Sequence, residues 1–217
     1  MRINQFTLAL AGVAALASAA AAHAEDFTPK AAGMVVLDVR LSDVVPADKD
    51  NLTTLAGAAT GLKTKTNDSV MPTLGVTYFF TPNWAVEAIA GTTHHTVKAV
   101  GGATNVEVKD TWVLPPVVAL QYHFMPAAKV SPYVGAGVNY MLFYSGKDKN
   151  GFQFKVDNGF GEALQAGVDV AMTGRWTLNA DLKKVFFQTK ATDTKNGVKS
   201  TINLDPWVAS VGVGYRF

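Results

Sequence analysis

Hydrophobic and polar residues alternate along most of the chain. In the segment 176–183, for example, Trp176 and Leu178 alternate with Asn179 and Asp181. Successive side chains of a strand point to opposite faces, so this period of two predicts a strand with one apolar and one mostly polar face. The pattern recurs in eight segments, at residues 35–42, 73–80, 84–91, 117–124, 133–142, 164–170, 176–183 and 207–217.

The connections between these segments alternate between short and long. Short turns fall at residues 81–83, 126–131 and 173–175, and the long polar segments are residues 45–70, 93–110, 145–161 and 189–200. This order predicts antiparallel up-and-down strands with all the short turns at one end. Eight such strands close into a barrel, so we expect an all-β fold in which residues 25–217 form a single barrel domain with four long polar loops.

The first 24 residues have the features of a targeting segment. Arg2 precedes an apolar stretch at residues 8–22, and the segment ends Ala22-His23-Ala24. A cation, a short apolar stretch and a small-x-small cleavage site predict a secretory signal peptide over residues 1–24. Beyond Glu25, no window approaches the ~18 consecutive apolar residues that a membrane-spanning helix needs.

Composition excludes several classes of function. The net charge is only +2, which is too small for a nucleic-acid-binding surface with its clustered basic face. Cysteine is absent, which excludes disulfides, zinc–thiolate sites and thiol nucleophiles. Charged residues make up 17% of the chain, below the roughly 25% of an average soluble domain, whereas 48% of residues are hydrophobic.

The apolar face of the barrel could point inward around a ligand, as in a lipocalin, or outward into lipid. Aromatic residues favour lipid, because those on the apolar face gather near both barrel ends, where membrane barrels carry aromatic girdles. Near the short turns and the C-terminus they are Tyr78, Phe80, Trp84, Tyr122, Phe124, Trp176, Tyr215 and Phe217; near the long segments they are Trp112, Tyr140, Tyr144, Phe186 and Trp207. Glycines on the opposite face suit a narrow interior. The pattern therefore predicts a transmembrane barrel.

Several motifs resemble the outer-membrane protein W (OmpW) family. They are Leu114–Pro116, Pro132–Tyr140, Gln165–Asp169, Leu204–Trp207 and Gly214–Phe217, and their spacing matches over nearly all of residues 25–217. The resemblance implies a monomeric barrel in a Gram-negative outer membrane, with both mature termini in the periplasm. It also implies passage of small hydrophobic molecules, since the family includes alkane-uptake proteins. Terminal Phe217 resembles the signal recognised by the outer-membrane assembly machinery.

The inward-facing positions divide into two sets along the barrel axis. Near the long segments the predicted lumen is apolar, and its candidate ligand-binding residues are Met71, Ile89, Pro115, Val117, Met141, Phe143, Val185, Phe187 and Leu204. Near the short turns it is polar, and the candidate barrier residues are Asp38, Arg40, Glu87, Gln121, Asp169, Asp181 and Lys183. Of the barrier set, Asp181 and Lys183 are expected to form an ion pair.

These two sets suggest a route for hydrophobic solutes. A continuous aqueous pore needs a polar lining and more strands. We hypothesise that small hydrophobic solutes enter between the outer loops, bind the apolar pocket and leave sideways into the bilayer. Pro115 and Pro116 cannot donate ladder hydrogen bonds, so they either open the wall there or merely bend the strand. The alternative function is a non-transporting barrel that stabilises the membrane or presents loops.

No residue set predicts an enzyme, a metal site or a cofactor. His94 and His95 are adjacent in a long polar segment and are expected to be solvated loop residues. His123 faces the lumen, but no Ser is placed as its nucleophile. Lys-rich segments at residues 147–149 and 195–199 keep exposed loops soluble, with lipopolysaccharide phosphates as possible counterions besides the surrounding lipid.

Overall fold

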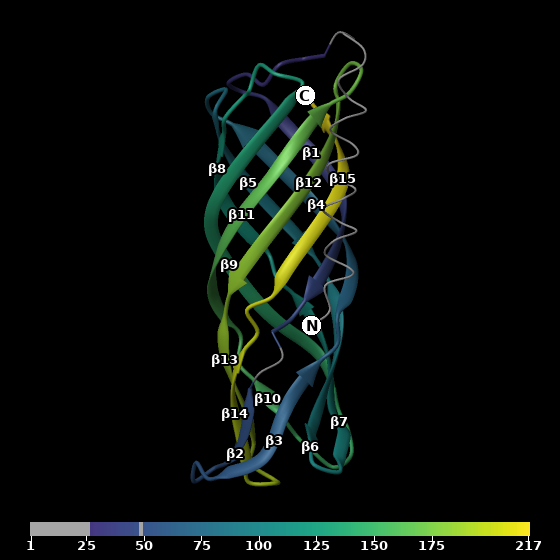
Figure 1. The fold of residues 1–217 in the computed structure, drawn as a ribbon, viewed down its shortest axis with the longest axis vertical. Coiled ribbons are helices and arrows are strands. Elements are labelled where there is room, and N and C mark those ends of the chain that lie inside the picture. Colours follow the sequence, from purple (N-terminus) through teal and green to yellow (C-terminus); the bar gives the residue numbers. More distant parts are fainter. Residues whose placement is uncertain (1–26, 48–49) are drawn as a thin grey trace.

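Eight long strands form a closed antiparallel barrel, as the alternation predicts (Figure 1). The computed structural model describes residues 27–47 and 50–217, so the predicted signal peptide lies outside the described residues. No helix in these two ranges is long and apolar enough to cross a membrane. The barrel strands are β1 (Val35–Val45), β4 (Ser69–Phe79), β5 (Trp84–Gly91), β8 (Val117–His123), β9 (Val130–Asp148), β11 (Gly159–Ala171), β12 (Trp176–Phe186) and β15 (Trp207–Arg216).

The first and last barrel strands pair with each other and close the sheet. β1 runs antiparallel to β15 from Val36 opposite Arg216 to Val45 opposite Trp207. The remaining barrel strands each pair with their sequence neighbour in the barrel, including β8 with β9. The strands are inclined to the barrel axis, and the C-terminus lies at the short-turn end, which is the upper end in Figure 1.

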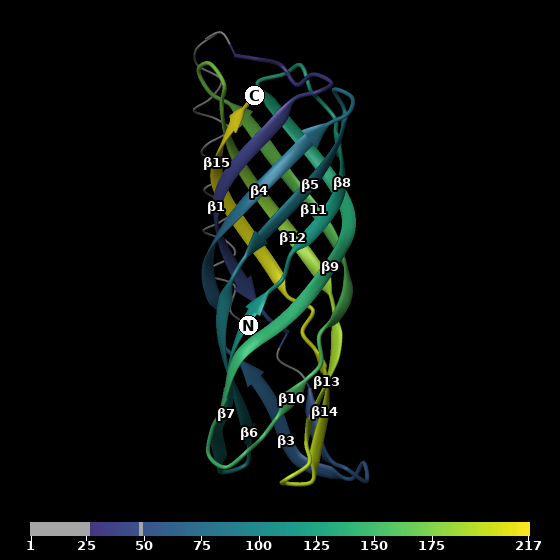
Figure 2. The same ribbon diagram turned by 180° about the vertical axis from the view of Figure 1, so that it is seen from behind.

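The four long connections are present as predicted, but they contain β-strands where polar loops were expected. Seven further strands prolong the sheet beyond the barrel, and we call them the extension (Figure 2, lower half). They are β2 (Asn51–Thr54), β3 (Ala59–Thr66), β6 (Thr93–Gly101), β7 (Thr104–Leu114), β10 (Lys155–Val156), β13 (Gln188–Asp193) and β14 (Val198–Asn203). Sparse apolar residues of these strands meet inside together with Phe154, which directly precedes β10. The buried cluster consists of Leu52, Ala99, Val108, Phe154 and Ala191. This cluster gives the extension its own core.

The barrel wall changes its hydrogen bonding at Pro115 and Pro116, between β7 and β8. The register does not change: Leu114 lies opposite Leu142 of β9 and Val117 opposite Asn139, so both strands follow one line along β9. On the other side, Val117 pairs with Ile89 of β5, and Val113 pairs with Thr93 of β6. Among the described residues, no ladder pair joins residues 90–92 to residues 114–116, and we call this stretch the seam.

The interior of the barrel relies on glycine to admit large side chains. A Cβ on Gly167 would lie 2.5 Å from the ring and hydroxyl of Tyr133, and one on Gly212 would lie 2.7 Å from the Arg40 side chain. Real Cβ contacts are not this short, so Ala at either position would displace its neighbour. These glycines therefore make room for the polar residues that fill the lumen.

The outer face of the barrel carries a belt of exposed large apolar side chains, to which all eight barrel strands contribute. Val39, Leu74 and Leu164 are each more than half exposed. Aromatic pairs border this belt near the short turns, where Trp84 lies 5.0 Å from Tyr122 and Trp176 lies 5.0 Å from Tyr215, both edge to face. A soluble protein rarely exposes so large an apolar surface, so the belt indicates contact with lipid.

Candidate functional site

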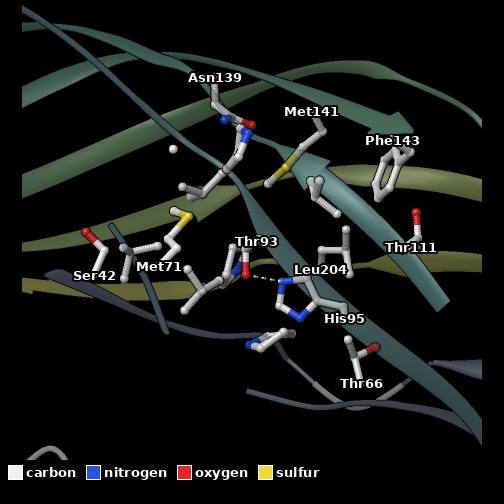
Figure 3. A pocket seen from close by; sticks show the side chains of 18 of the residues that line it. Ser42, Thr66, Met71, Thr93, His95, Thr111, Asn139, Met141, Phe143 and Leu204 are labelled. Carbon is white, nitrogen blue, oxygen red and sulfur yellow. Dashed lines mark hydrogen bonds between the residues drawn. The ribbon is translucent and has the colours of Figure 1, made fainter. Parts of the chain in front are cut away.

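An apolar cavity of about 100 Å³ lies in the lumen where the barrel passes into the extension. Eight of the nine candidate ligand-binding residues line it, namely Met71, Ile89, Pro115, Val117, Met141, Phe143, Val185 and Leu204. The ninth, Phe187, is buried in the same apolar cluster as Met141, and its ring lies 6.2 Å from that of Phe143. Figure 3 shows Met71, Met141, Phe143 and Leu204 converging on the cavity.

The cavity walls come from strands on opposite sides of the barrel. Ile89 on β5, Val117 on β8, Met141 on β9 and Val185 on β12 all belong to one buried apolar cluster. Each occupies an inward position of its strand, so the period of two puts their side chains into the same space. Side chains this buried exclude water, and the cavity therefore offers an apolar environment to a ligand.

The extension supplies the other end of the cavity, including a residue whose environment the sequence did not predict. His95 on β6 is only 6% exposed and lines the cavity, so the expectation of a solvated loop residue was wrong. Its Nδ1 lies 2.9 Å from the carbonyl oxygen of Asn67, and its Nε2 lies 3.3 Å from Oγ1 of Thr93. Burial is the largest influence on its pKa and lowers it below the usual value for histidine, so the ring is neutral at pH 7.

His94, the neighbour of His95, points to the other face of β6. Its ring lies 5.1 Å from that of Trp112 on β7. Successive residues of a strand face opposite ways, which is why one histidine borders the cavity and the other does not. No group of three or more potential metal ligands occurs in the part of the chain that the structure describes.

Charged residues fill the lumen on the short-turn side of the cavity. Arg40 binds Asp38 with a nitrogen–oxygen distance of 2.6 Å and Glu87 at the same distance. Lys183 binds Glu87 at 3.1 Å and Asp181 at 2.5 Å. We call these five residues the charged network; each is at most 6% exposed. Two cations and three carboxylates thus neutralise most of one another's charge inside a narrow barrel, and the Asp181–Lys183 pair forms as expected.

Neutral groups continue the charged network toward the short turns. The Tyr133 hydroxyl donates to Asp181 at 2.9 Å, and the Asn179 amide donates to that hydroxyl at 3.0 Å and to Asp169 at 2.8 Å. Gln121 lies beside His123 instead, with 3.1 Å between Oε1 and Nε2. The cavity left among these side chains is only about 20 Å³. The polar half of the lumen is therefore nearly filled.

The segment before β1 closes the short-turn end of the lumen, which the alternation of the strands does not predict. Lys30 is 6% exposed, and its ammonium lies 3.0 Å from an Asp169 carboxylate oxygen. Its backbone N–H donates to the carbonyl of Pro126, and Gly33 donates to the carbonyl of Phe79. Lys30 precedes the first alternating segment, so no periodicity pointed to it. Tyr133 occupies an inward position of β9, but its hydroxyl contacts come from Asp181 and Asn179 of β12, which only the closed barrel brings near it.

Comparison with known proteins decides the family. Residues 31–217 match the OmpW family over almost the whole described chain. This chain belongs to the OmpW family. Among its relatives, it is 45% identical to the uncharacterized outer-membrane protein y4mB of Sinorhizobium fredii over 70% of this chain and 67% of that protein. It is 32% identical to outer membrane protein W of Vibrio cholerae over 99% of this chain and all of that protein.

Other similar proteins match over a shorter stretch of sequence or by structure. The dibenzothiophene metabolism operon protein PahQ of Pseudomonas aeruginosa is 29% identical over 64% of this chain and 68% of its own. The crystal structure of OprG from the same species superimposes with a TM-score of 0.81 at 26% identity, covering 88% of this chain and 99% of OprG. The structure of AlkL in lipid bilayers superimposes with a TM-score of 0.69 at 27% identity, covering 90% of this chain and 95% of AlkL.

Family and fold together place the chain in the outer membrane. The exposed apolar belt of this OmpW-family barrel faces lipid, and the aromatic residues at its borders lie where lipid meets water. The charged network then sits within the membrane, enclosed by the barrel. The extension projects beyond the barrel on the side of the long connections.

Proposed function

We propose that this protein is a passive outer-membrane channel, without catalytic activity, for small hydrophobic molecules. The observation that carries the proposal is the apolar cavity, which ends at a nearly filled charged network. In this proposal the extension faces the outside of the cell, and the short turns and both mature termini face the periplasm. Phe217 would then lie at the periplasmic end, where the outer-membrane assembly machinery would recognise it.

Burial of apolar surface supplies the binding energy in this proposal. Each methylene group removed from water contributes about 0.8 kcal/mol, so a ring or short chain held between Met141 and Ile89 is stabilised by several kcal/mol. Continuing straight through the lumen would require separating buried ion pairs such as Arg40–Glu87, and a hydrocarbon offers them nothing in return. The ligand therefore has to leave the cavity sideways.

The seam supports a lateral exit. In an antiparallel ladder, the N–H and C=O of one residue point to the same neighbouring strand. Tyr140 of β9 donates to the carbonyl of Pro116, so Pro116 faces β9, and the missing donor of Pro115 faces the strand that carries residues 90–92. Pro115 and Gly91 also line the cavity. The wall thus lacks ladder bonds beside the cavity, which favours opening over a mere bend of the strand.

The relatives support the same class of solute. PahQ is named as a protein of an operon for the metabolism of dibenzothiophene, an apolar aromatic compound. A ligand of that kind matches the chemistry of the cavity wall. The protein would then act without cofactor or partner protein, as a monomer surrounded by lipid and lipopolysaccharide.

Uptake by cells tests the proposal. Gram-negative cells that lack other family members would express the wild type or a variant with Met141→Asp and Phe143→Asp, and uptake of labelled naphthalene would be measured. Two carboxylates in the cavity wall either keep water in the cavity or lose their hydration when a solute binds, and both oppose binding of an apolar solute. We therefore expect uptake to fall about tenfold or more, to the level of cells without the protein. The polar solute glucose should enter equally in all strains.

A matched control introduces the same charges elsewhere. Ala58→Asp with Asn105→Asp places two carboxylates on exposed positions of the extension, outside the cavity, and should retain wild-type uptake. Both variants must reach the outer membrane in equal amounts. Equal naphthalene uptake by the cavity variant and the wild type would contradict the proposal and favour the non-transporting alternative.

A further inference from the structure

The cavity is apolar on its walls but ends, next to the charged network, in a floor of polar groups. Asn139 on β9 is 1% exposed and lines the cavity. Its Nδ2 donates to the carbonyl of Pro116 at 3.1 Å, whereas its Oδ1 has no hydrogen-bond partner in the described part of the chain. An unsatisfied buried acceptor is unfavourable and therefore calls for a partner.

Hydroxyl groups and an ammonium border the same end of the cavity. Ser42, Thr73, Ser210 and Lys183 all line it. The Ser42 hydroxyl lies 3.0 Å from that of Thr73 and 2.8 Å from that of Ser210. Figure 3 shows Ser42 and Asn139 toward one end of the cavity and Phe143 and Thr111 toward the other. The floor therefore offers both donors and acceptors to a ligand whose remainder touches apolar walls.

We propose that this floor binds the head group of a small amphiphile that carries a neutral hydroxyl, such as a short alcohol. The inference rests on the proposed function and specifies its substrate class: the preferred solute is hydrophobic at one end and hydroxylated at the other. Its hydroxyl donates to Asn139 Oδ1 and accepts from the floor hydroxyls or from Lys183. Its apolar part lies between Met71, Ile89 and Met141.

Charge and hydrogen bonding distinguish this head group from others. Lys183 already holds two carboxylates, Asp181 at 2.5 Å and Glu87 at 3.1 Å. A carboxylate ligand would add a third negative charge around one ammonium in a buried site, which is unfavourable. A pure hydrocarbon would leave Asn139 Oδ1 without a donor. A hydroxyl both donates and accepts, so it satisfies the floor without adding charge.

Three ligands with the same carbon frame test the inference: toluene, benzyl alcohol and benzoate. The protein would be placed in phosphatidylcholine nanodiscs, and the affinity of each compound would be divided by its partition into empty nanodiscs to remove the contribution of lipid. We expect this ratio to be about 3- to 10-fold higher for benzyl alcohol than for toluene, the effect of one net hydrogen bond. Benzoate should bind most weakly.

The variant Asn139→Leu separates the head-group site from the cavity. It should abolish the preference for benzyl alcohol, while the apolar walls still bind toluene. The Pro116 carbonyl keeps its second donor, the backbone N–H of Tyr140 at 3.1 Å, so the wall should tolerate the change. Gln165→Leu is the matched control, because Gln165 is a buried amide that does not line the cavity; it should retain the preference.

Ser42→Ala provides a second, smaller change, should the Leu variant fail to fold. It should reduce the preference for benzyl alcohol by about 2- to 5-fold, while the apolar walls still bind toluene. Equal ratios for toluene and benzyl alcohol in the wild type, an undiminished preference in both floor variants, or tightest binding of benzoate would overturn the head-group site. Toluene binding would still support the proposed function in each of those cases. Failure of all three ligands to bind would contradict the proposed function itself.

Discussion

The two halves of the lumen are built by the same barrel strands in the same alternation, yet one half is nearly filled with polar side chains and the other contains an apolar cavity. On β12, Asp181 and Lys183 belong to the charged network, and Val185, the next inward position, belongs to the apolar cavity. On β9, Asn139 and Met141 mark the same change. The alternation decides only which residues face inward. The height of each residue along the barrel decides whether the lumen is sealed or receptive.

The contrast has a simple physical origin. Ion pairs and hydrogen bonds have preferred distances and directions, so they draw polar side chains across the lumen until little space remains. Apolar side chains have no such directed contacts, and those on opposite walls of a barrel reach the centre only if they are large enough. The cavity of about 100 Å³ beside one of about 20 Å³ reflects this difference.

The largest effect is expected from breaking the polar half. Glu87 is 0% exposed and binds both Arg40 and Lys183, so Glu87→Leu would remove two buried ion pairs at once and leave each of these cations with a single carboxylate. Removing one partner of a buried ion pair typically costs about 3–5 kcal/mol, and we expect a loss of that size in the free energy of unfolding. Urea unfolding in detergent micelles, followed by tryptophan fluorescence, measures it.

Glu162→Gln is the control for this prediction, because Glu162 lies on the exposed face of β11. Its unfolding midpoint should stay near that of the wild type. A Glu87→Leu protein as stable as the wild type would show that the charged network contributes nothing to holding the polar half together.

A smaller effect is expected from locking the wall beside the apolar half. The chain has no cysteine, so Ala90→Cys with Pro116→Cys introduces a single pair. The register on both sides of the seam places these residues opposite each other, at a separation compatible with a disulfide. If solutes leave through the seam, oxidation should lower naphthalene uptake about tenfold, and reduction should restore it.

The matched control places the disulfide within an intact part of the same ladder. Ala88→Cys and Val118→Cys are opposite residues of β5 and β8, and joining them should leave uptake unchanged in either redox state. Uptake that is independent of the seam disulfide would contradict lateral exit while leaving the cavity itself in place.

The smallest effect is expected on the pH dependence of stability, through His95 at the extension end of the cavity. His95 has a lowered pKa in the folded protein, mainly because burial disfavours its charged form. The unfolded chain therefore takes up this proton at a higher pH than the folded one. Its contribution to stability is complete above the unfolded value of about 6.5 and is lost as the pH falls from there toward the lowered pKa.

An NMR titration of the His95 ring protons should give a pKa below that of an unstructured histidine. His95→Gln should make the urea midpoint slightly less sensitive to pH between 7 and 5. A ring that titrates at or above 6.5 would show that His95 is not buried against the cavity in solution.

Periodicity predicted the barrel and most of its interior because it depends only on local geometry. The inward positions of Glu87, Met141 and Lys183 follow from counting by two along single strands. Aromatic placement near the strand ends then indicated which face meets lipid. These features need no knowledge of distant contacts, and the closed eight-stranded barrel confirms the fold they predicted.

The missed features depend on contacts between segments far apart in the sequence. Strand β3 contains Thr64, Lys65 and Thr66, and its polar composition looks like a loop until β6 pairs with it. Burial of His95 requires the carbonyl of Asn67, twenty-eight positions away. Lys30 needs Asp169 from β11. In the sequence, a polar residue that is solvated looks the same as one that is buried against a partner from a distant segment.

The pairing of β1 with β15 has a consequence for how the protein is made. The two strands that close the barrel lie at opposite ends of the described chain, and ten residue pairs, from Val36–Arg216 to Val45–Trp207, join them. Contacts of such long sequence separation form slowly, and until they form the sheet has two open edges that can pair with other chains. Before these two strands pair, the sheet does not enclose a lumen. Closure of this one ladder therefore converts a sheet prone to aggregation into a barrel with a sealed half and a receptive half.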